Sequence, residues 1–382
     1  MSLSLFLKVH RQLPISRIIF RCISTSQMSS SNPAPRPNTT TNTKPSSKKP
    51  SNKNSSNNQS KMGKKKSNTP GEEHLLLPTP PSSLGIVDTH THLASTYSFY
   101  RQRYKEGKYD NVFDFIKAMY EGRNVEAIVD VWCDAPVQKS WKTFADSALT
   151  PEDRQSCWGG IEYWFALGVH PHDAKHYNDA VEKDILEAMT HPRCVALGEI
   201  GLDYHYDNSP RDVQRNVFRR QLKHAVRLGK PLVIHTREAE EDTEKILKEE
   251  VPKDYKIHVH CLSDSPEFAA RLLAHFPNLY IGITGVITYS SNTNTSAVIS
   301  QMSSASPSEP LRILLETDAP FMTPGNLYAS LPASLKGKKL PLSHTAMIPW
   351  TAEFVAGVAG KGWDVDKVMR EGRDNARKMY GV

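Results

Sequence analysis

Eight short apolar runs, separated by stretches with helical periodicity, constrain the fold of this chain more than any other feature. Most of the runs are continuously apolar and do not alternate with polar residues, as expected for strands that are covered on both faces. The runs span residues 85–88, 127–131, 165–169, 195–200, 231–234, 257–259, 279–283 and 313–316. We therefore predict eight parallel strands that are joined through helices.

Three of the intervening segments show a clear helical pattern. Residues 111–122 and 211–229 carry apolar residues on one face and end in glycine, and residues 266–275 repeat the same spacing. Regular alternation of strands and helices predicts an α/β fold, a (β/α)₈ TIM barrel over residues 84–382. No second folded domain is needed to account for this part of the chain.

Histidine and acidic residues stand at the C-terminal ends of five of these runs. The carboxyl ends of the strands in a parallel barrel meet at one mouth, so these side chains are expected to converge there. Two histidines one residue apart on a strand also point to the same side. The six candidate metal ligands are His90, His92, Glu199, His235, His260 and Asp318.

This set of ligands predicts two divalent cations, Mg²⁺, Mn²⁺ or Zn²⁺, and the sequence does not choose among them. His90, His92 and Asp318 would hold the first cation, and His235 and His260 would complete the second site. Glu199 has two carboxylate oxygens and can bridge the two ions. Two cations about 3.5–4 Å apart suit phosphodiester hydrolysis, because they stabilise the attacking and the leaving oxygen.

Glu199 and Asp318 are the predicted catalytic residues, and Asp318 would also accept a proton from the attacking water. Two further acids stand beside the ligands. We expect Asp88 to orient a metal-binding histidine, and we expect Glu316 to cap or pair beside the site.

Four residues on the same rim are candidate substrate contacts. His170 directly follows the third run and can contact a substrate oxygen, and Arg237 can clamp a phosphate. Asp203 and Tyr204 follow Glu199, and the tyrosine ring can stack on a base. The alternatives are an Arg237 paired with a glutamate of the next helix and a Tyr204 that serves packing.

Two connections are longer than a minimal barrel requires. Residues 134–163 follow the second run, and residues 324–342 follow the eighth. Loops after barrel strands lie on the catalytic face, so both are candidate substrate walls or lids. The alternative is a surface insertion without a role in the reaction.

The N-terminal part of the chain differs in composition from the rest. Its first 71 residues contain 13 of the 48 Lys and Arg and none of the 41 Asp and Glu, so the remainder has a net charge of about −6. Residues 1–25 have the composition of a mitochondrial transit peptide, with a working start at Met28 as the alternative. Residues 26–83 are predicted to be a disordered, low-complexity basic tail. We expect a mitochondrial location if the transit peptide is real, and otherwise a cytoplasmic or nuclear one.

The five cysteines are odd in number and form no CxxC pattern. This spacing favours free thiols in a reducing compartment over a disulfide framework or a zinc finger.

The strand-end motifs resemble those of the TatD-like metal-dependent deoxyribonucleases, a family of amidohydrolase-like barrels. The likeness runs from about residue 84 to residue 382. The matching stretches are VDTHTH (87–92), GVHPH (168–172), ALGEIGLDY (196–204), PLVIHTR (231–237), HC (260–261), LETDAP (315–320) and NAR (375–377). The resemblance implies a TIM barrel, a divalent-metal site at the six residues named above, and 3′–5′ exonucleolytic hydrolysis of DNA ends or single strands.

The chain departs from this family at its substrate walls. Ala94 stands where the family usually has Asp or Asn, and residues 342–346 stand where an Arg-Asn-Glu-Pro segment is common. The loop around Trp141 and Trp158 is also longer than usual. These departures are similar to those of a fungal subgroup, whose members are sometimes described as partners of a cell-cycle ubiquitin-ligase subunit.

Three functions therefore compete at this level. The first is a metal-dependent deoxyribonuclease, and the second is a metal-dependent ester or amide hydrolase of a small molecule. The third is a protein-interaction partner built on a retained barrel. No apolar run is long enough to span a bilayer, so we expect no membrane partner.

Overall fold

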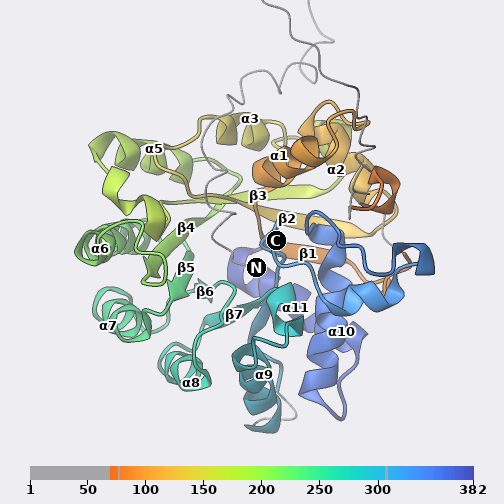
Figure 1. The fold of residues 1–382 in the computed structure, drawn as a ribbon. Helices are drawn as coiled ribbons and strands as arrows, with labels where there is room; N and C mark the ends of the chain where they lie inside the picture. Colours follow the sequence, from red (N-terminus) through yellow and green to blue (C-terminus); the bar gives the residue numbers. More distant parts are fainter. Residues whose placement is uncertain (1–68, 76–77, 306–308) are drawn as a thin grey trace, which may run out of the picture.

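The computed structural model describes residues 69–75, 78–305 and 309–382. Eight parallel strands lie side by side in chain order and curve into a nearly closed barrel that helices surround (Figure 1). The strands are β1 (Ile86–Thr91), β2 (Val125–Trp132), β3 (Glu162–Leu167), β4 (Cys194–Asp203), β5 (Leu232–Arg237), β6 (Ile257–Val259), β7 (Leu279–Ile283) and β8 (Ile313–Leu315). The predicted TIM barrel is confirmed, and each predicted run overlaps one strand.

The barrel closes through the segment that follows β8. The backbone N–H of Asp318 donates to His90 O at 2.9 Å, and the N–H of His92 donates to Ala319 O at 3.0 Å. The Thr89 hydroxyl adds a bond to Leu315 O at 3.0 Å. These contacts place the end of β8 beside the end of β1, as barrel closure requires.

The three predicted helices are confirmed as α2, α6 and α8. Asn111 caps α2 by accepting from the Asp114 N–H, and Gly229 ends α6 with a φ of 64°. None of the helices in the described part combines the length and apolarity needed to cross a bilayer. The helices are α1 (Leu93–Arg103), α2 (Val112–Tyr120), α3 (Ser140–Asp146), α4 (Pro151–Trp158), α5 (Asp179–Met189), α6 (Arg211–Leu228), α7 (Glu240–Glu250), α8 (Pro266–His275), α9 (Asn294–Ala305), α10 (Ile348–Ala359) and α11 (Val365–Tyr380).

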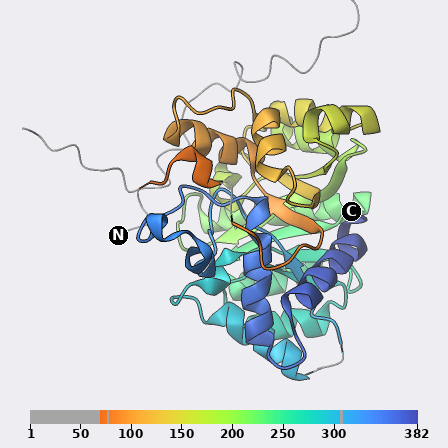
Figure 2. The ribbon, with the colours of Figure 1, turned by 90° about the vertical axis from the view of Figure 1, so that its right-hand side faces the viewer.

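The apolar core has two parts. The larger part fills the space between the strands and the surrounding helices. The smaller part lies inside the barrel, where strand residues such as Val129 and Val233 meet Met379 and Tyr380 of α11. Figure 2 shows the C-terminal end of α11 on the side opposite the blue segment that follows β8. Helix α11 therefore closes one end of the barrel and leaves the other end free for a site.

The disordered tail was predicted to extend to residue 83, and this boundary is wrong. Glu72–Leu75 forms a short 3₁₀ helix, and the side chain of Leu75 is buried. The Tyr100 hydroxyl donates to Glu72 Oε1 at 2.6 Å, which ties this segment to α1. The composition gave no sign of this short helix, because one buried leucine is enough to dock so short a segment. The predicted transit peptide, the tail up to residue 68 and residues 76–77 lie outside the described residues.

The segment 134–163 is mostly folded structure. It contains α3 and α4, and the side chains of Trp141 and Trp158 are buried in the core. Only its first residues, 134–138, reach the barrel mouth. Residues 324–342 contribute nothing to the lining of the mouth cavity described below. Both tryptophans therefore belong to the core. Within the segment 134–163, only residues 134–138 remain candidates for a wall of the substrate cavity.

Asp88 does not orient a histidine ring, contrary to our prediction. Its carboxylate accepts from the Thr317 N–H and hydroxyl, from the Thr345 hydroxyl and from the backbone N–H of His90. Asp88 thus joins the end of β1 to the segments after β8. The stretch 342–346, expected among the substrate walls, is buried and supplies one of these partners.

His344 should make the stability of the fold depend on pH. Burial lowers its pKa to about 4, whereas an unfolded chain has a histidine pKa near 6.5. Below pH 6.5, His344 binds a proton in the unfolded state but not in the folded state. The free energy of unfolding therefore falls as the pH falls from about 6.5 towards 4. The expected loss is about 2 kcal/mol between pH 7 and pH 5.

Urea unfolding at the two pH values, in the presence of EDTA, measures this loss. The His344→Gln variant lacks the titrating ring and should lose about 2 kcal/mol less than the wild type over the same interval. Equal losses in the two proteins would show that His344 is not the source.

Candidate metal centre

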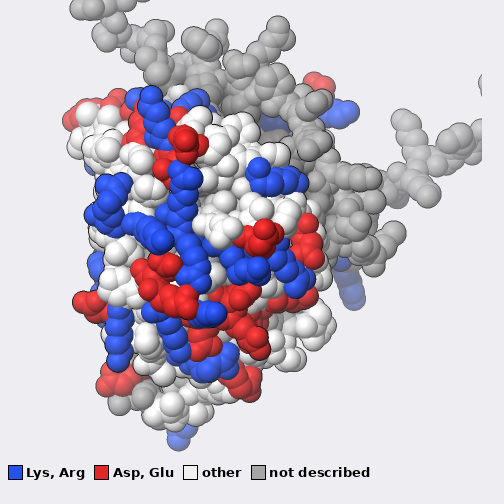
Figure 3. Space-filling view, turned by 90° about the vertical axis from the view of Figure 1, so that its left-hand side faces the viewer, with Lys and Arg blue, Asp and Glu red and all other residues white. Residues whose placement is uncertain are grey.

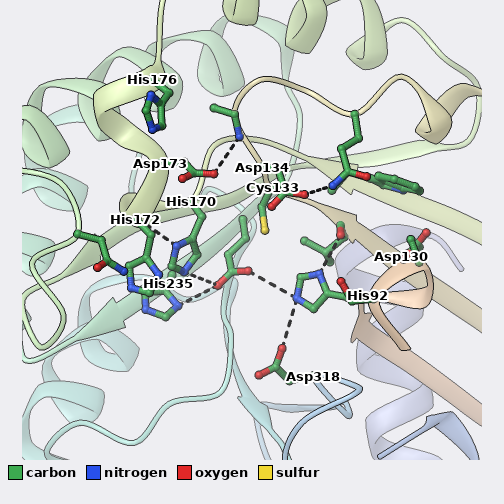
Figure 4. Close-up of a pocket in the computed structure, with 18 of the residues that line it drawn as sticks. His92, Asp130, Cys133, Asp134, His170, His172, Asp173, His176, His235 and Asp318 are labelled. Atoms are coloured by element: carbon green, nitrogen blue, oxygen red, sulfur yellow. Dashed lines mark hydrogen bonds and ion pairs between the residues drawn. The ribbon is translucent and has the colours of Figure 1, made fainter. Parts of the chain in front are cut away.

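The first group of predicted ligands comes from the ends of β1 and β8. His90 Nε2 and His92 Nε2 lie 3.3 Å apart, and Asp318 Oδ1 lies 3.8 Å and 3.4 Å from them. Asp318 has a φ of 51°, a left-handed conformation that aspartate tolerates better than most residues. The local turn therefore directs the carboxylate towards the two histidines, as Figure 4 shows for His92 and Asp318.

The second group comes from β4, β5 and the end of β6. Glu199 Oε1 lies 2.8 Å from His235 Nδ1 and 2.9 Å from His260 Nε2. His170, which follows β3, brings its Nε2 to 3.5 Å from the same oxygen. His170, Glu199 and His235 each offer one ligand atom within 4.8 Å of the others.

Glu199 lies between the two groups and directs one oxygen to each. Its Oε1 faces His235 and His260, whereas its Oε2 lies 3.5 Å from His90 Nε2 and 3.9 Å from His92 Nε2. The structure thus brings together all six residues that the sequence singled out as ligands.

The donor set fits bound cations. Two ring nitrogens, on His90 and His92, face each other at 3.3 Å with carboxylates on either side. Unprotonated imidazole nitrogens repel each other in this position unless a proton or a metal ion lies between them. Imidazole and carboxylate are ligands that Zn²⁺ and Mn²⁺ accept, and carboxylate also suits Mg²⁺.

The charges of the centre are strongly coupled. Burial opposes the charged form of Glu199, but His260, His170 and His235 outweigh it and hold the carboxyl pKa well below its ordinary value. Burial together with His260 lowers the pKa of His90 to about 4. For His92, burial is outweighed by Asp318 and Glu199, which raise its pKa to about 9. The centre therefore keeps Glu199 ionised and His90 neutral, the forms that bind metal, whereas His92 carries a proton that a bound cation would displace.

A cavity of about 820 Å³ opens directly over the centre. Its walls include residues 134–136 and Gln138 after β2, the segment after β3, and Phe321 after β8. Among the described residues that line the cavity, five are acidic and Lys175 is the one lysine or arginine. The acidic residues are Asp130, Asp134, Asp173, Glu199 and Asp318.

Comparison with known proteins identifies the family to which this chain belongs. Residues 87–381 match the sequence model of a family described as TatD related DNase. This chain belongs to that family. It is accordingly a metal-dependent hydrolase of the TatD type, and its candidate metal ligands lie at the mouth of its barrel.

Two curated relatives of this TatD-family chain are named as nucleases. The human 3′-5′ RNA nuclease TATDN2 is 36% identical over 305 residues, which cover 78% of this chain and 35% of the relative. The chain thus spans about a third of the length of that relative. The Escherichia coli 3′-5′ ssDNA/RNA exonuclease TatD is 31% identical over 198 residues, covering 51% of this chain and 73% of the relative.

A solved structure of the TatD homologue YjjV from Escherichia coli is similar in fold. It has a TM-score of 0.57 at 21% identity and covers 78% of this chain and 98% of its own. At this level of identity the likeness shows the barrel alone.

The predicted substrate contacts of this TatD-family chain lie in different surroundings. His170 lines the cavity. Asp203 is buried, and its Oδ2 lies 2.9 Å from His172 Nε2 and 3.3 Å from His235 Nε2, so it holds two rings of the rim in place. The Arg237 guanidinium lies 4.9 Å from the centre of the Tyr206 ring, and its role as a phosphate clamp stays a prediction.

Tyr204 does not face the cavity. Its hydroxyl is bonded to Asp242 on α7 and accepts from Arg215 on α6, and Arg211 stacks on its ring. The structure therefore favours the packing alternative, and base stacking by Tyr204 is wrong for this conformation. The sequence could not show this, because the direction of the ring depends on where α6 and α7 lie.

Cys133 and Lys175 also line the cavity, although neither was predicted from the sequence. Cys133 directly follows β2, and its Sγ lies within 4.8 Å of ligand atoms of His92 and Glu199. The strand-end position was a usable signal, but a lone cysteine is more often an inert buried thiol. None of the four described cysteines forms a disulfide, as predicted, and Cys22 lies outside the described part.

Gly201→Ala should disrupt the centre without removing a ligand. Gly201 has a φ of 146°, and a Cβ there would lie 1.9 Å from His235 O on β5. Strand β5 would have to move, and His235 would move with it. We expect at least about 3 kcal/mol of destabilisation from strain and overpacking, together with weaker cation binding.

Chemical denaturation and a cation titration check this expectation. Gly122→Ala is a suitable control, since Gly122 also has a positive φ but has open space around it. A Gly201→Ala protein with the stability and cation affinity of the control would contradict the close approach of β4 and β5.

Proposed function

We propose that this chain is a two-metal 3′–5′ exonuclease that acts on single-stranded nucleic acid, with DNA as its substrate class. One observation carries the two-metal part of the proposal: the two oxygens of Glu199 face two separate sets of ligands. A bridging carboxylate of this kind suits two cations that together stabilise the attacking and leaving oxygens of a phosphodiester.

Bound cations would lower the pKa of a coordinated water and neutralise charge that develops on the phosphate. The chain's own residues supply the rest. Asp318 faces the cavity, where its carboxylate can accept the proton of the attacking water. His170 lines the opposite side; its Nδ1 accepts from the His172 N–H, so its Nε2–H can donate a hydrogen bond to a phosphate oxygen. Lys175 adds the fixed positive charge at the rim.

The charge of the cavity supports a requirement for more than one cation. Five acidic side chains and one lysine line it, so the protein alone would repel a phosphate. Two divalent cations would add positive charge at the bottom of the cavity. A phosphodiester can therefore approach the bottom of this cavity only when the centre is loaded.

The outer surface supports recognition at the mouth and not along the side. Figure 3 shows the face that carries α6 and α7, where blue and red side chains alternate. Arg219 pairs with Glu249 and Glu250, and Arg220 pairs with Glu182 and Asp179. These arginines are compensated, so this face offers no uniformly basic track for a polyanion.

The polarity and substrate class rest on the relatives. One is named a 3′-5′ RNA nuclease and another a 3′-5′ ssDNA/RNA exonuclease. A cavity that receives one end of a strand fits exonucleolytic cleavage better than cleavage within a duplex.

Single-stranded DNA with a 5′ label tests the proposal. Protein loaded with Mg²⁺, Mn²⁺ or Zn²⁺ should shorten it from the 3′ end, and phosphorothioate linkages at that end should stop the reaction. His235→Ala should be inactive, and His224→Ala, on the outer face of α6, should match the wild type. Intact DNA after incubation with the folded, cation-loaded protein would reject it, and faster loss of matched RNA would move the substrate class to RNA.

The acidic cavity with its single lysine favours one second candidate, a metal-dependent ester or amide hydrolase of a small molecule. Aryl esters and amides in the same assay would reveal it. The predicted role as a protein-interaction partner in cell-cycle control stays a prediction.

A further inference from the structure

A column of buried polar side chains lies inside the barrel beneath the metal centre. The hydroxyl of Tyr380, on α11, lies 2.7 Å from His258 Nδ1 on β6. His258 Nε2 lies 2.9 Å from Glu316 Oε2, directly after β8. His258 and Glu316 are fully buried and Tyr380 is nearly so. The column therefore connects the helix that closes the barrel with the floor of the site.

The contacts of the column determine which of its atoms donate hydrogen bonds and which accept them. Burial keeps the pKa of Tyr380 well above its ordinary value, so its hydroxyl stays protonated and donates to His258 Nδ1. The proton of a neutral His258 is then on Nε2, which faces Glu316. Glu316 Oε1 also accepts from the Cys261 N–H at 2.6 Å. The Cys261 N–H thus holds Glu316 Oε1, and Glu316 Oε2 lies against His258 Nε2.

The upper end of the column meets one predicted ligand from each cation position. His90 and His260 stack with ring centres 4.0 Å apart, and one ring nitrogen of each lies within 4.8 Å of a Glu316 oxygen. Their Nε2 atoms face Glu199, at 3.5 Å and 2.9 Å. Their Nδ1 atoms are buried without a hydrogen-bond partner, and His260 Nδ1 lies 3.8 Å from Glu316 Oε1.

A histidine that binds metal through Nε2 carries its proton on Nδ1 and needs an acceptor for it there. Glu316 offers a carboxylate near both rings: its Oε1 lies 3.8 Å from His260 Nδ1, and one of its oxygens lies within 4.8 Å of a ring nitrogen of His90. The position of Gly282 shows how closely Glu316 is packed. A Cβ at Gly282 would lie 2.3 Å from Glu316 Oε1 and 2.5 Å from His258 Nε2, so only glycine fits opposite the pair.

We propose that Glu316 is a positioning residue that orients His90 and His260, one ligand of each cation, by accepting hydrogen bonds from their Nδ1–H groups, with His258 and Tyr380 holding it in place. One carboxylate then supports both cation positions at once. The proposal rests on the metal centre but not on the substrate, so it survives if nucleic acid proves not to be hydrolysed.

Cation binding by Glu316→Gln tests the proposal. The amide keeps the size of the side chain and an acceptor for the Cys261 N–H, but it cannot serve two imidazole donors as a carboxylate does. We expect affinity for Zn²⁺ and Mn²⁺, measured by competition with a chromophoric chelator, to fall about 10–100-fold. The visible absorption spectrum of the Co²⁺-loaded protein should also change, because the ligand rings lose their orientation.

Glu371→Gln is the matched control, since Glu371 also accepts a backbone N–H, that of Leu311, but lies away from the site. Its affinity and Co²⁺ spectrum should match the wild type. Melting in EDTA separates positioning from folding: Glu316→Gln should melt close to the wild type there. Wild-type affinity and spectrum in a folded Glu316→Gln protein would overturn the proposal.

Tyr380→Phe decides the matter if Glu316→Gln fails to fold. It removes one hydroxyl at the far end of the column and touches no predicted ligand. We expect a smaller loss of cation affinity, about threefold to tenfold, at the low end of outer-shell effects. Unchanged affinity in Tyr380→Phe would then count against the column.

Discussion

Replacement of Glu199 by alanine should abolish hydrolysis and empty both cation positions. Glu199 lies between the two ligand groups and contacts the first through Oε2 and the second through Oε1. Without it, the buried imidazoles of His90, His235 and His260 lose their shared counter-charge. We expect the rate of substrate hydrolysis to fall at least about a thousandfold, within the range seen when a group central to catalysis is removed.

Elemental analysis beside a hydrolysis assay measures both parts of this effect. Glu238→Ala is a suitable control, because Glu238 is an exposed carboxylate near the same rim that contacts His205 and does not line the cavity. A Glu199→Ala protein that retains two cations and hydrolyses within tenfold of the wild type would contradict the bridging role.

Removal of divalent cations should be nearly as damaging, and it should also loosen the fold. EDTA should abolish hydrolysis, since the acidic cavity no longer accepts a phosphate. Cations present at a thousand times their dissociation constant stabilise the native state by about 4 kcal/mol per site. For a domain of this size we expect the melting temperature to fall by about 8 °C or more.

Differential scanning calorimetry with and without EDTA measures this shift. Glu199→Ala supplies an internal control, because a chain that binds no cation should melt at the same temperature under both conditions. Full hydrolysis by wild-type protein after exhaustive chelation would be incompatible with a metal centre.

Much of the fold and of the ligand set was predictable because both depend on local periodicity. Strands such as β6 and β7 are continuous apolar runs, and their predicted bounds match the structure. His90 and Asp318 are far apart in the chain but stand at the ends of neighbouring strands. The geometry of a closed barrel therefore brings them together whatever the loops do.

The failures concern side chains whose partners are distant in sequence. Asp88 bonds to Thr345, 257 residues away, and no local pattern announces that contact. Tyr204 turns from the cavity because α6 and α7 supply polar partners for its hydroxyl. Glu316 looked like an accessory acid beside Asp318, and only its burial against His258 and Gly282 shows how closely it is fitted.

The central claim is that two cations lie at the barrel mouth and share Glu199. Anomalous diffraction from crystals of the Mn²⁺- or Zn²⁺-loaded protein tests it most directly. The account predicts two peaks: one beside His90, His92 and Asp318, and one beside His235 and His260, with a Glu199 oxygen at each. A single peak, or peaks away from Glu199 in a folded and cation-saturated protein, would contradict it.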